Sequence, residues 1–308
     1  MLTAICAGVL VEVMAGKVLC EPTELYNTLS QHHRHSRLTE PNYLCLIDAR
    51  AEGPYYCSHI VTARNAKWDS KGKFIIPPDV EIESMRYIIV YDSNTSSFLD
   101  SGPAIDCAES LEKVSRYPVQ ILIGGYERFS AVYPFFRTQK IIYTIRELES
   151  LRPYPVEILP GQLYMGDFKQ ATNPQILRDL RLTALINVSE ESSLVSEKGS
   201  YSVLHVRVAD SVDADLSGSF ERVCVFLASC LNAGSAAFIF STHGISRCSA
   251  MAMAFLMHHL QYTLKEAWDH VQKCKANMRP NRGFVQQLSS WELSVQGRTV
   301  TDISEPNY

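Results

Sequence analysis

The chain has 308 residues, enough for two hydrophobic cores, since single cores usually stop growing at about 250 to 300 residues. Its 46% hydrophobic and 20% charged residues and its net charge of −4 are typical of a soluble globular protein; they exclude a fibrous or disordered chain and a basic nucleic-acid-binding surface. The nine cysteines form no C-x-x-C pair, which indicates reduced thiols in an intracellular compartment and no disulfide framework or zinc site. We expect no metal and no cofactor.

Residues 1–19 are apolar but contain Glu12 and Lys17, lack a basic beginning and are too interrupted to span a bilayer. We interpret them as the first strand of a globular domain, with a poor secretory or mitochondrial leader as the alternative. The expected compartment is the cytoplasm, and a mitochondrial location stays open.

Short β-rich runs follow at residues 43–50, 86–92 and 118–125, and the segment 102–115 has a helical composition behind a Gly-Pro start. This alternation predicts a parallel or mixed sheet covered by helices. Residues 134–160 contain four prolines and little periodicity. We therefore predict an α/β domain over 1–133, a linker over 134–156, a second α/β domain over 157–296 and a polar tail over 297–308.

In the second half, strands are predicted at residues 162–168, 182–188, 203–208 and 236–240. A helix between the last two has Phe220, Val223 and Leu227 on one face and ends at Gly234. Thr263 and Glu266 fit a capping box at the start of a later helix.

The segment STHGISR, residues 241–247, lies between the last predicted strand and an apolar helix. Backbone N–H groups in such a loop can surround an anion, and the helix N-terminus adds partial positive charge. Gly244 allows close backbone approach, and Arg247 supplies a two-pronged donor for phosphate oxygens. The loop is therefore a candidate phosphate-binding site.

The run FIFSTHGISRCSA, residues 238–250, resembles the signature loop of dual-specificity protein tyrosine phosphatases, which reads His-Cys-x-x-Gly-x-Ser-Arg-Ser. The resemblance covers roughly residues 157–292 and includes the segments EILPGQLYMGDFKQA, LINVSE, RVADSVDADL and ANMRPNRGFVQQLSSWE. In the first half, residues 43–66 and 121–136 resemble the rhodanese-like domain that precedes the catalytic domain in mitogen-activated-protein-kinase phosphatases. The resemblance implies a rhodanese-like α/β domain followed by a phosphatase-like α/β domain with a central mixed sheet flanked by helices.

By this resemblance, the nucleophilic cysteine falls on Ser241 and the histidine before it on Phe240, so both catalytic residues are absent. A serine hydroxyl does not ionise as a cysteine does beside a helix N-terminus and an arginine, and it needs an adjacent base. Asp210 stands at the position of the general acid. The resemblance therefore implies no catalytic residue in this loop. It implies that the whole loop binds phosphate, through Ser241, Thr242, His243, Gly244, Ile245, Ser246 and Arg247.

The first half departs from the pattern of its resemblance at two places. No cysteine follows the run 86–92 directly, and Cys107 falls in the next predicted helix, so persulfide chemistry is not expected. The region that docks kinases in the family carries only the scattered Lys67, Lys71 and Lys73, which puts kinase docking in doubt.

Together the two halves resemble the pseudophosphatases of the dual-specificity family. The expected function is that of a catalytically inactive signalling regulator that binds phosphorylated proteins or active phosphatases, with signalling kinases as further candidate partners. Direct nucleic-acid binding and a membrane span are not expected. The alternatives are a weak residual phosphatase that uses Ser241 or Cys248, and a scaffold whose phosphate loop is a relic.

Overall fold

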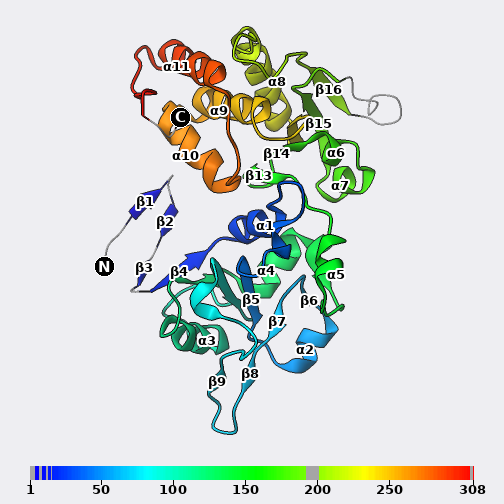
Figure 1. Ribbon diagram of the computed structural model, residues 1–308, viewed down its shortest axis with the longest axis vertical. Helices are drawn as coiled ribbons and strands as arrows, with labels where there is room; N and C mark the ends of the chain where they lie inside the picture. The colour runs from blue at the N-terminus through cyan, green and yellow to red at the C-terminus, as the bar shows by residue number, and fades with distance from the viewer. Residues whose placement is uncertain (1–3, 7–8, 12, 15, 192–200, 306–307) are drawn as a thin grey trace. The chain divides into compact units, whose positions relative to one another are not determined.

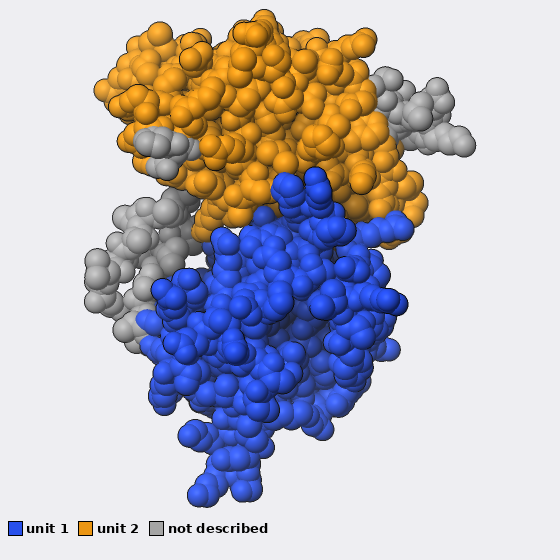
Figure 2. Space-filling model, in the orientation of Figure 1, with its two compact units in different colours: residues 1–152 blue, residues 153–308 orange. Residues whose placement is uncertain are grey.

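The computed structural model describes residues 4–6, 9–11, 13–14, 16–191, 201–305 and 308. The chain divides into two compact units, residues 1–152 and 153–308, which Figure 2 colours separately. Each unit has its own sheet and its own hydrophobic core. This confirms the predicted succession of two α/β domains.

The N-terminal unit is built on a six-stranded sheet in the order β3-β4-β11-β10-β5-β7, parallel except for the pair β3 and β4 (Figure 1). Its strands are β1 (Ala4–Cys6), β2 (Val9–Val11), β3 (Val13–Met14), β4 (Lys17–Cys20), β5 (Leu44–Asp48), β6 (His59–Ile60), β7 (Arg64–Asn65), β8 (Lys67–Trp68), β9 (Phe74–Ile75), β10 (Tyr87–Tyr91), β11 (Val119–Leu122) and β12 (Arg137–Thr138). Its helices are α1 (Pro22–Ser30), α2 (Glu52–Cys57), α3 (Pro103–Glu112), α4 (Gly125–Val132) and α5 (Ile145–Glu149), with short 3₁₀ turns η1 (Arg37–Thr39), η2 (Ile82–Ser84) and η3 (Pro134–Phe136).

The centre of this sheet is β10, a continuous apolar run that is buried on both faces, as parallel strands under helices are. Its Ile88 and Val90 share a core with Ala104, Cys107 and Leu111 of α3. The Cys107 thiol is thus packed in the core, where burial raises its pKa.

Residues 134–152, most of the segment that we predicted as a linker, lie in the N-terminal unit. β12 pairs with β6, and the amide of Gln139 donates to the carbonyl of Cys57 at 2.9 Å. Thr144 and Glu147 form a capping box at the start of α5. Local hydrogen bonds therefore order a stretch whose prolines and weak periodicity suggested a connection.

The C-terminal unit is built on a five-stranded sheet in the order β13-β14-β17-β15-β16, with only β13 antiparallel. Its strands are β13 (Val156–Leu159), β14 (Leu163–Asp167), β15 (Leu182–Asn187), β16 (Ser202–His205) and β17 (Ala236–Ser241). Its helices are α6 (Phe168–Ala171), α7 (Pro174–Asp179), α8 (Phe220–Asn232), α9 (Arg247–Leu260), α10 (Leu264–Cys274) and α11 (Arg282–Gln296), with the 3₁₀ turn η5 (Ser217–Ser219).

Helix α9 is the centre of the second core. Residues 247–257 are all buried, and α9 packs against α8, α10, α11 and β17. A helix that is apolar all round needs such an enclosed position, and its alternating alanines and methionines let the neighbouring helices approach closely. The predicted capping box of Thr263 and Glu266 at the start of α10 is confirmed.

The segment that we predicted as a polar tail is partly packed on this unit. The buried carboxylate of Glu292 accepts hydrogen bonds from the backbone N–H groups of Leu264, Val300 and Thr301 and from the Thr301 hydroxyl, at 2.8 to 3.0 Å. The ring of Tyr308 lies edge-on to Trp268 at 4.9 Å. Among the described residues, no helix is long and apolar enough to cross a membrane.

Candidate phosphate-binding site

The site lies at the carboxyl edge of the second sheet. β14, β17, β15 and β16 run parallel, so the loops that follow them meet at one edge. Asn187 at the end of β15 is paired with Phe240 near the end of β17. This register brings the loop 241–247 close to the residues that follow β15.

Gly244 gives the loop its close packing. Its φ of +67° is in the left-handed region, and a Cβ atom at this position would lie 2.7 to 2.9 Å from backbone atoms of Gly166 and Asp167. Only glycine tolerates both conditions. The loop therefore rests directly on the backbone at the end of β14.

Ile245 and Ser246 fix the part of the loop that follows Gly244. The carbonyl of Ile245 accepts from the N–H of Arg279 at 3.0 Å and from the Ser249 hydroxyl at 2.7 Å. The Ser246 hydroxyl donates to Oδ1 of Asp210 at 2.6 Å and accepts from the N–H of Asn281 at 3.2 Å. Segments distant in sequence thus hold the loop in one shape.

Arg247 begins α9, and its side chain is only 6% exposed. Its Nη1 donates to the carbonyl of Val208 at 2.9 Å, and its Nη2 donates to Oγ1 of Thr242 at 2.8 Å. Its buried Nε has no hydrogen-bond partner among the described residues, and Oδ2 of Asp210 lies 3.8 Å away. A buried guanidinium N–H of this kind carries a desolvation cost until an acceptor reaches it.

Asp210 lies beside the loop. Besides Ser246, its Oδ1 accepts from the side-chain amide of Asn281 at 2.9 Å, and Asn281 also caps α11 through the N–H of Phe284. The carboxylate that the family resemblance assigns to acid catalysis is thus tied to the loop and to the start of α11.

Thr242 connects the loop to the segment after β15. Its hydroxyl accepts from Arg247 and donates to the carboxylate of Glu191, with distances of 2.8 Å to Oε2 and 3.1 Å to Oε1. The hydrogen bond from Thr242 is the largest of the effects that lower the pKa of Glu191, and the charge of Arg247 adds to it. Glu191 is therefore an ionised carboxylate one hydroxyl group away from the guanidinium.

Phe240 and Ser241 are both buried at the end of β17. The Phe240 ring packs against Phe168 and Phe238, at centroid distances of 6.0 and 5.5 Å. No histidine or carboxylate of the described residues accepts a hydrogen bond from the Ser241 hydroxyl, and His243 is exposed. Within the described part of the chain, Ser241 therefore has no partner of the kind that activates a serine nucleophile.

The second potential nucleophile, Cys248, is fully buried in the first turn of α9. Burial is the main cause that raises the pKa of its thiol, despite the nearby Ser241 hydroxyl and Lys275 ammonium. A protonated, enclosed thiol is a poor nucleophile.

Sequence reasoning missed the two residues that complete the site, Asn281 and Glu191. Asn281 lies in the segment with the predicted resemblance. Glu191 lies three residues after the end of the predicted strand 182–188, so the rule that loops after parallel strands meet at one edge could have found it. The other residues predicted for the loop, Thr242 to Arg247, lie together as the order of the chain requires.

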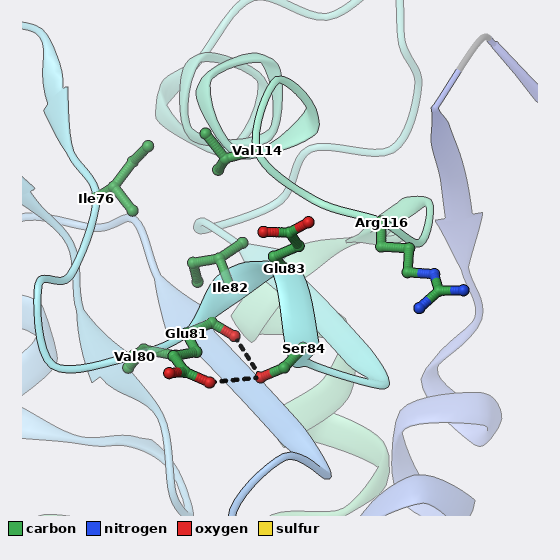
Figure 3. A pocket seen from close by; sticks show the side chains of 8 residues that line it. All are labelled: Ile76, Val80, Glu81, Ile82, Glu83, Ser84, Val114 and Arg116. Atoms are coloured by element: carbon green, nitrogen blue, oxygen red, sulfur yellow. Dashed lines mark hydrogen bonds between the residues drawn. The ribbon is translucent and has the colours of Figure 1, made fainter.

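Other parts of the chain are weaker candidates for a functional site than the loop 241–247. The candidate docking residue Lys67 pairs with Glu52 at 2.6 Å, and both side chains are more than half exposed. A surface cavity of about 610 Å³ in the N-terminal unit contains no buried polar side chain (Figure 3). It is lined by Ile76, Val80, Glu81, Ile82, Glu83, Ser84, Val114 and Arg116. Within the described part of the chain, no cluster of three or more His, Cys, Asp or Glu side chains could hold a metal ion.

The fold and the site define an α/β domain with a tightly packed loop, residues 241–247, between its central strand and a buried helix. Residues 163–294 match the family described as dual specificity phosphatase, catalytic domain. This match lies within the C-terminal unit, residues 153–308.

Similar proteins extend the comparison. Human dual specificity protein phosphatase 5 is 33% identical over 201 residues, 58% of this chain and 51% of its own length. Rat dual specificity protein phosphatase 4 is 29% identical over 269 residues, 78% of this chain and 67% of its own length. The matches to the human and rat phosphatases 5 thus span about half of those proteins. The crystal structure of human DUSP28 is 29% identical and has a TM-score of 0.45, covering 47% of this chain and 97% of that chain. The match to phosphatase 4 reaches into the N-terminal unit, which is rhodanese-like as in that protein.

Proposed function

We propose that the chain is a catalytically inactive member of this family, a regulator that binds phosphorylated proteins through the loop 241–247. The observation that carries the proposal is Arg247: its buried Nε lacks a hydrogen-bond partner among the described residues. Phosphate oxygens are the natural acceptors for a guanidinium beside a helix N-terminus.

Inactivity is supported by the residues at the end of β17. The family loop places a cysteine where this chain has Ser241, and a histidine where it has Phe240. Ser241 has no activating base among the described residues, and the thiol of Cys248 is enclosed and protonated. Phosphate would be held without an attacking group.

The partners follow from this chemistry. A loop that binds without turnover can shield a phosphorylated side chain from active phosphatases. Regulation of an active phosphatase, or of a signalling kinase through the rhodanese-like unit, is the alternative mechanism within the same proposal.

The test is a quantitative pull-down from cell lysate with the wild-type chain, Arg247→Ala and Arg247→Lys. A parallel lysate is pretreated with a broad-specificity phosphatase. We expect the same set of partners to disappear with either variant and after pretreatment, because lysine lacks the fork that binds two oxygens. Thermal unfolding of each variant serves as the control for folding.

If the folded variants still bind the partners, and the partners are also captured from the pretreated lysate, the loop does not recognise phosphate. The chain would then be a scaffold with a relic loop, and binding would lie on other surfaces.

A further inference from the structure

We infer that Glu191 lowers the affinity of the loop 241–247 for doubly charged oxyanions. The inference rests on the proposed function, since it concerns the same phosphate-binding loop. It starts from a contact that sequence reasoning missed, the chain of hydrogen bonds from Arg247 through Thr242 to Glu191.

The first step concerns the donors of Arg247. Nη1 is used by the carbonyl of Val208, and Nη2 is used by Thr242. Only Nε is left without a hydrogen-bond partner among the described residues. A bidentate grip on an oxyanion needs two N–H groups on one edge of the guanidinium. Thr242 uses one of the two N–H groups of Nη2, so an anion that reaches Nε binds beside Thr242 and its partner Glu191.

The second step concerns what holds Thr242. Its hydroxyl has one proton, and this proton is donated to Glu191, so its oxygen is oriented to accept from Arg247. The backbone of Glu191 is itself fixed, because the side-chain amide of the buried Asn187 donates to its carbonyl at 2.7 Å. The end of β15 thus positions the carboxylate.

The third step concerns charge. Glu191 is ionised, and no lysine or arginine in the described part of the chain forms an ion pair with it within 4.0 Å. The second carboxylate, Asp210, lies 3.8 Å from Nε. An incoming dianion therefore meets two carboxylates, both exposed to solvent, around one buried guanidinium, and the repulsion between like charges opposes its binding.

The test is calorimetric titration of the purified chain with sulfate, which is a dianion throughout the neutral range. Glu191→Gln keeps the size of the side chain and can still accept from Thr242, but it removes the charge. We expect it to lower the Kd for sulfate by about tenfold. Glu190→Gln, the exposed neighbour with the same change in net charge, should leave the Kd within about twofold. Adding Arg247→Lys to Glu191→Gln should abolish the gain.

The outcomes separate the two proposals. Equal sulfate affinity of wild type and Glu191→Gln overturns the role of Glu191 and leaves phosphate binding by the loop intact. Binding by Glu191→Gln alone supports the role of Glu191, while the native loop would be closed to anions and the proposed function would fail. No binding by either protein, with both folded, would overturn both. An equal gain in Glu190→Gln would reduce the effect to net charge and overturn the role of Glu191.

Discussion

At position 241, the choice between a cysteine sulfur and a serine oxygen decides whether the side chain can ionise near neutral pH. Ser241 is buried at the end of β17, and α9 begins six residues later with Arg247. A thiol at such a place can be a thiolate near neutral pH, whereas a serine hydroxyl stays protonated without a base. Phe240 is a second difference from the family loop, because an aromatic ring packed on Phe168 and Phe238 occupies the position of the family's histidine.

Replacing both residues, with Phe240→His and Ser241→Cys, should therefore create measurable hydrolysis of an aryl phosphate. Asp210 already lies beside the loop, so it can protonate the leaving group. Adding Asp210→Asn should lower the new activity by about 100-fold, which is a common contribution of general acid catalysis. Initial rates with p-nitrophenyl phosphate measure both effects. A folded double variant no more active than wild type would contradict this account of inactivity.

At the scale of elements, the loop depends on the contact between two backbone segments. β17 and β14 are neighbours, and Gly244 rests on the backbone of Gly166 and Asp167. Because these atoms belong to strand β14 and its turn into α6, they cannot move away as a flexible side chain would. Close packing of the loop is thus part of the stability of the C-terminal unit.

Gly244→Ala should lower the free energy of unfolding of this unit by about 2 to 5 kcal/mol, from left-handed strain and from overpacking together. Gly161→Ala is the matched control, since Gly161 also has a positive φ of +68° but has no atom within 4 Å of an added Cβ. It should cost about 1 to 2 kcal/mol. Urea unfolding of the two variants measures the difference. Equal losses in the free energy of unfolding for the two variants would mean that the loop can move away from β14.

At the scale of the whole molecule, the two units have separate sheets and separate cores, which predicts separate unfolding transitions. In the N-terminal unit the buried Asp48 accepts from Nε and Nη2 of Arg50, at 2.9 and 2.6 Å. The guanidinium of Arg50 lies over the ring of Tyr126, 3.7 Å from its centroid.

Asp48→Asn should lower the transition temperature of the N-terminal unit alone, with a loss of about 3 to 5 kcal/mol, because it leaves a buried guanidinium without its counter-charge. Glu52→Gln breaks the exposed pair with Lys67 and should cost less than about 1 kcal/mol. Scanning calorimetry of the full chain resolves the two transitions. A shift of both transitions in Asp48→Asn would argue against independent cores.

The sequence was sufficient for the features that depend on neighbours along the chain. It predicted two α/β domains, the strands 162–168, 182–188 and 236–240, the capping box of Thr263 and Glu266, and a loop that places Gly244 and Arg247 before a buried helix. Apolar periodicity, capping residues and a family motif are local patterns, so they can be recognised without knowing how the sheets are ordered.

Only the tertiary structure decided which groups surround the loop. Glu191 lies 51 residues from Thr242, and Asp210 lies 71 residues from Asn281. These pairs meet because β15 and β17 are adjacent and in a particular register, and because α11 starts beside the loop. Glu292 likewise gathers donors from the start of α10 and from residues 300 and 301. Strand order and helix packing set these contacts, and a sequence pattern specifies neither, since hydrogen bonds between distant segments depend on how the whole core closes.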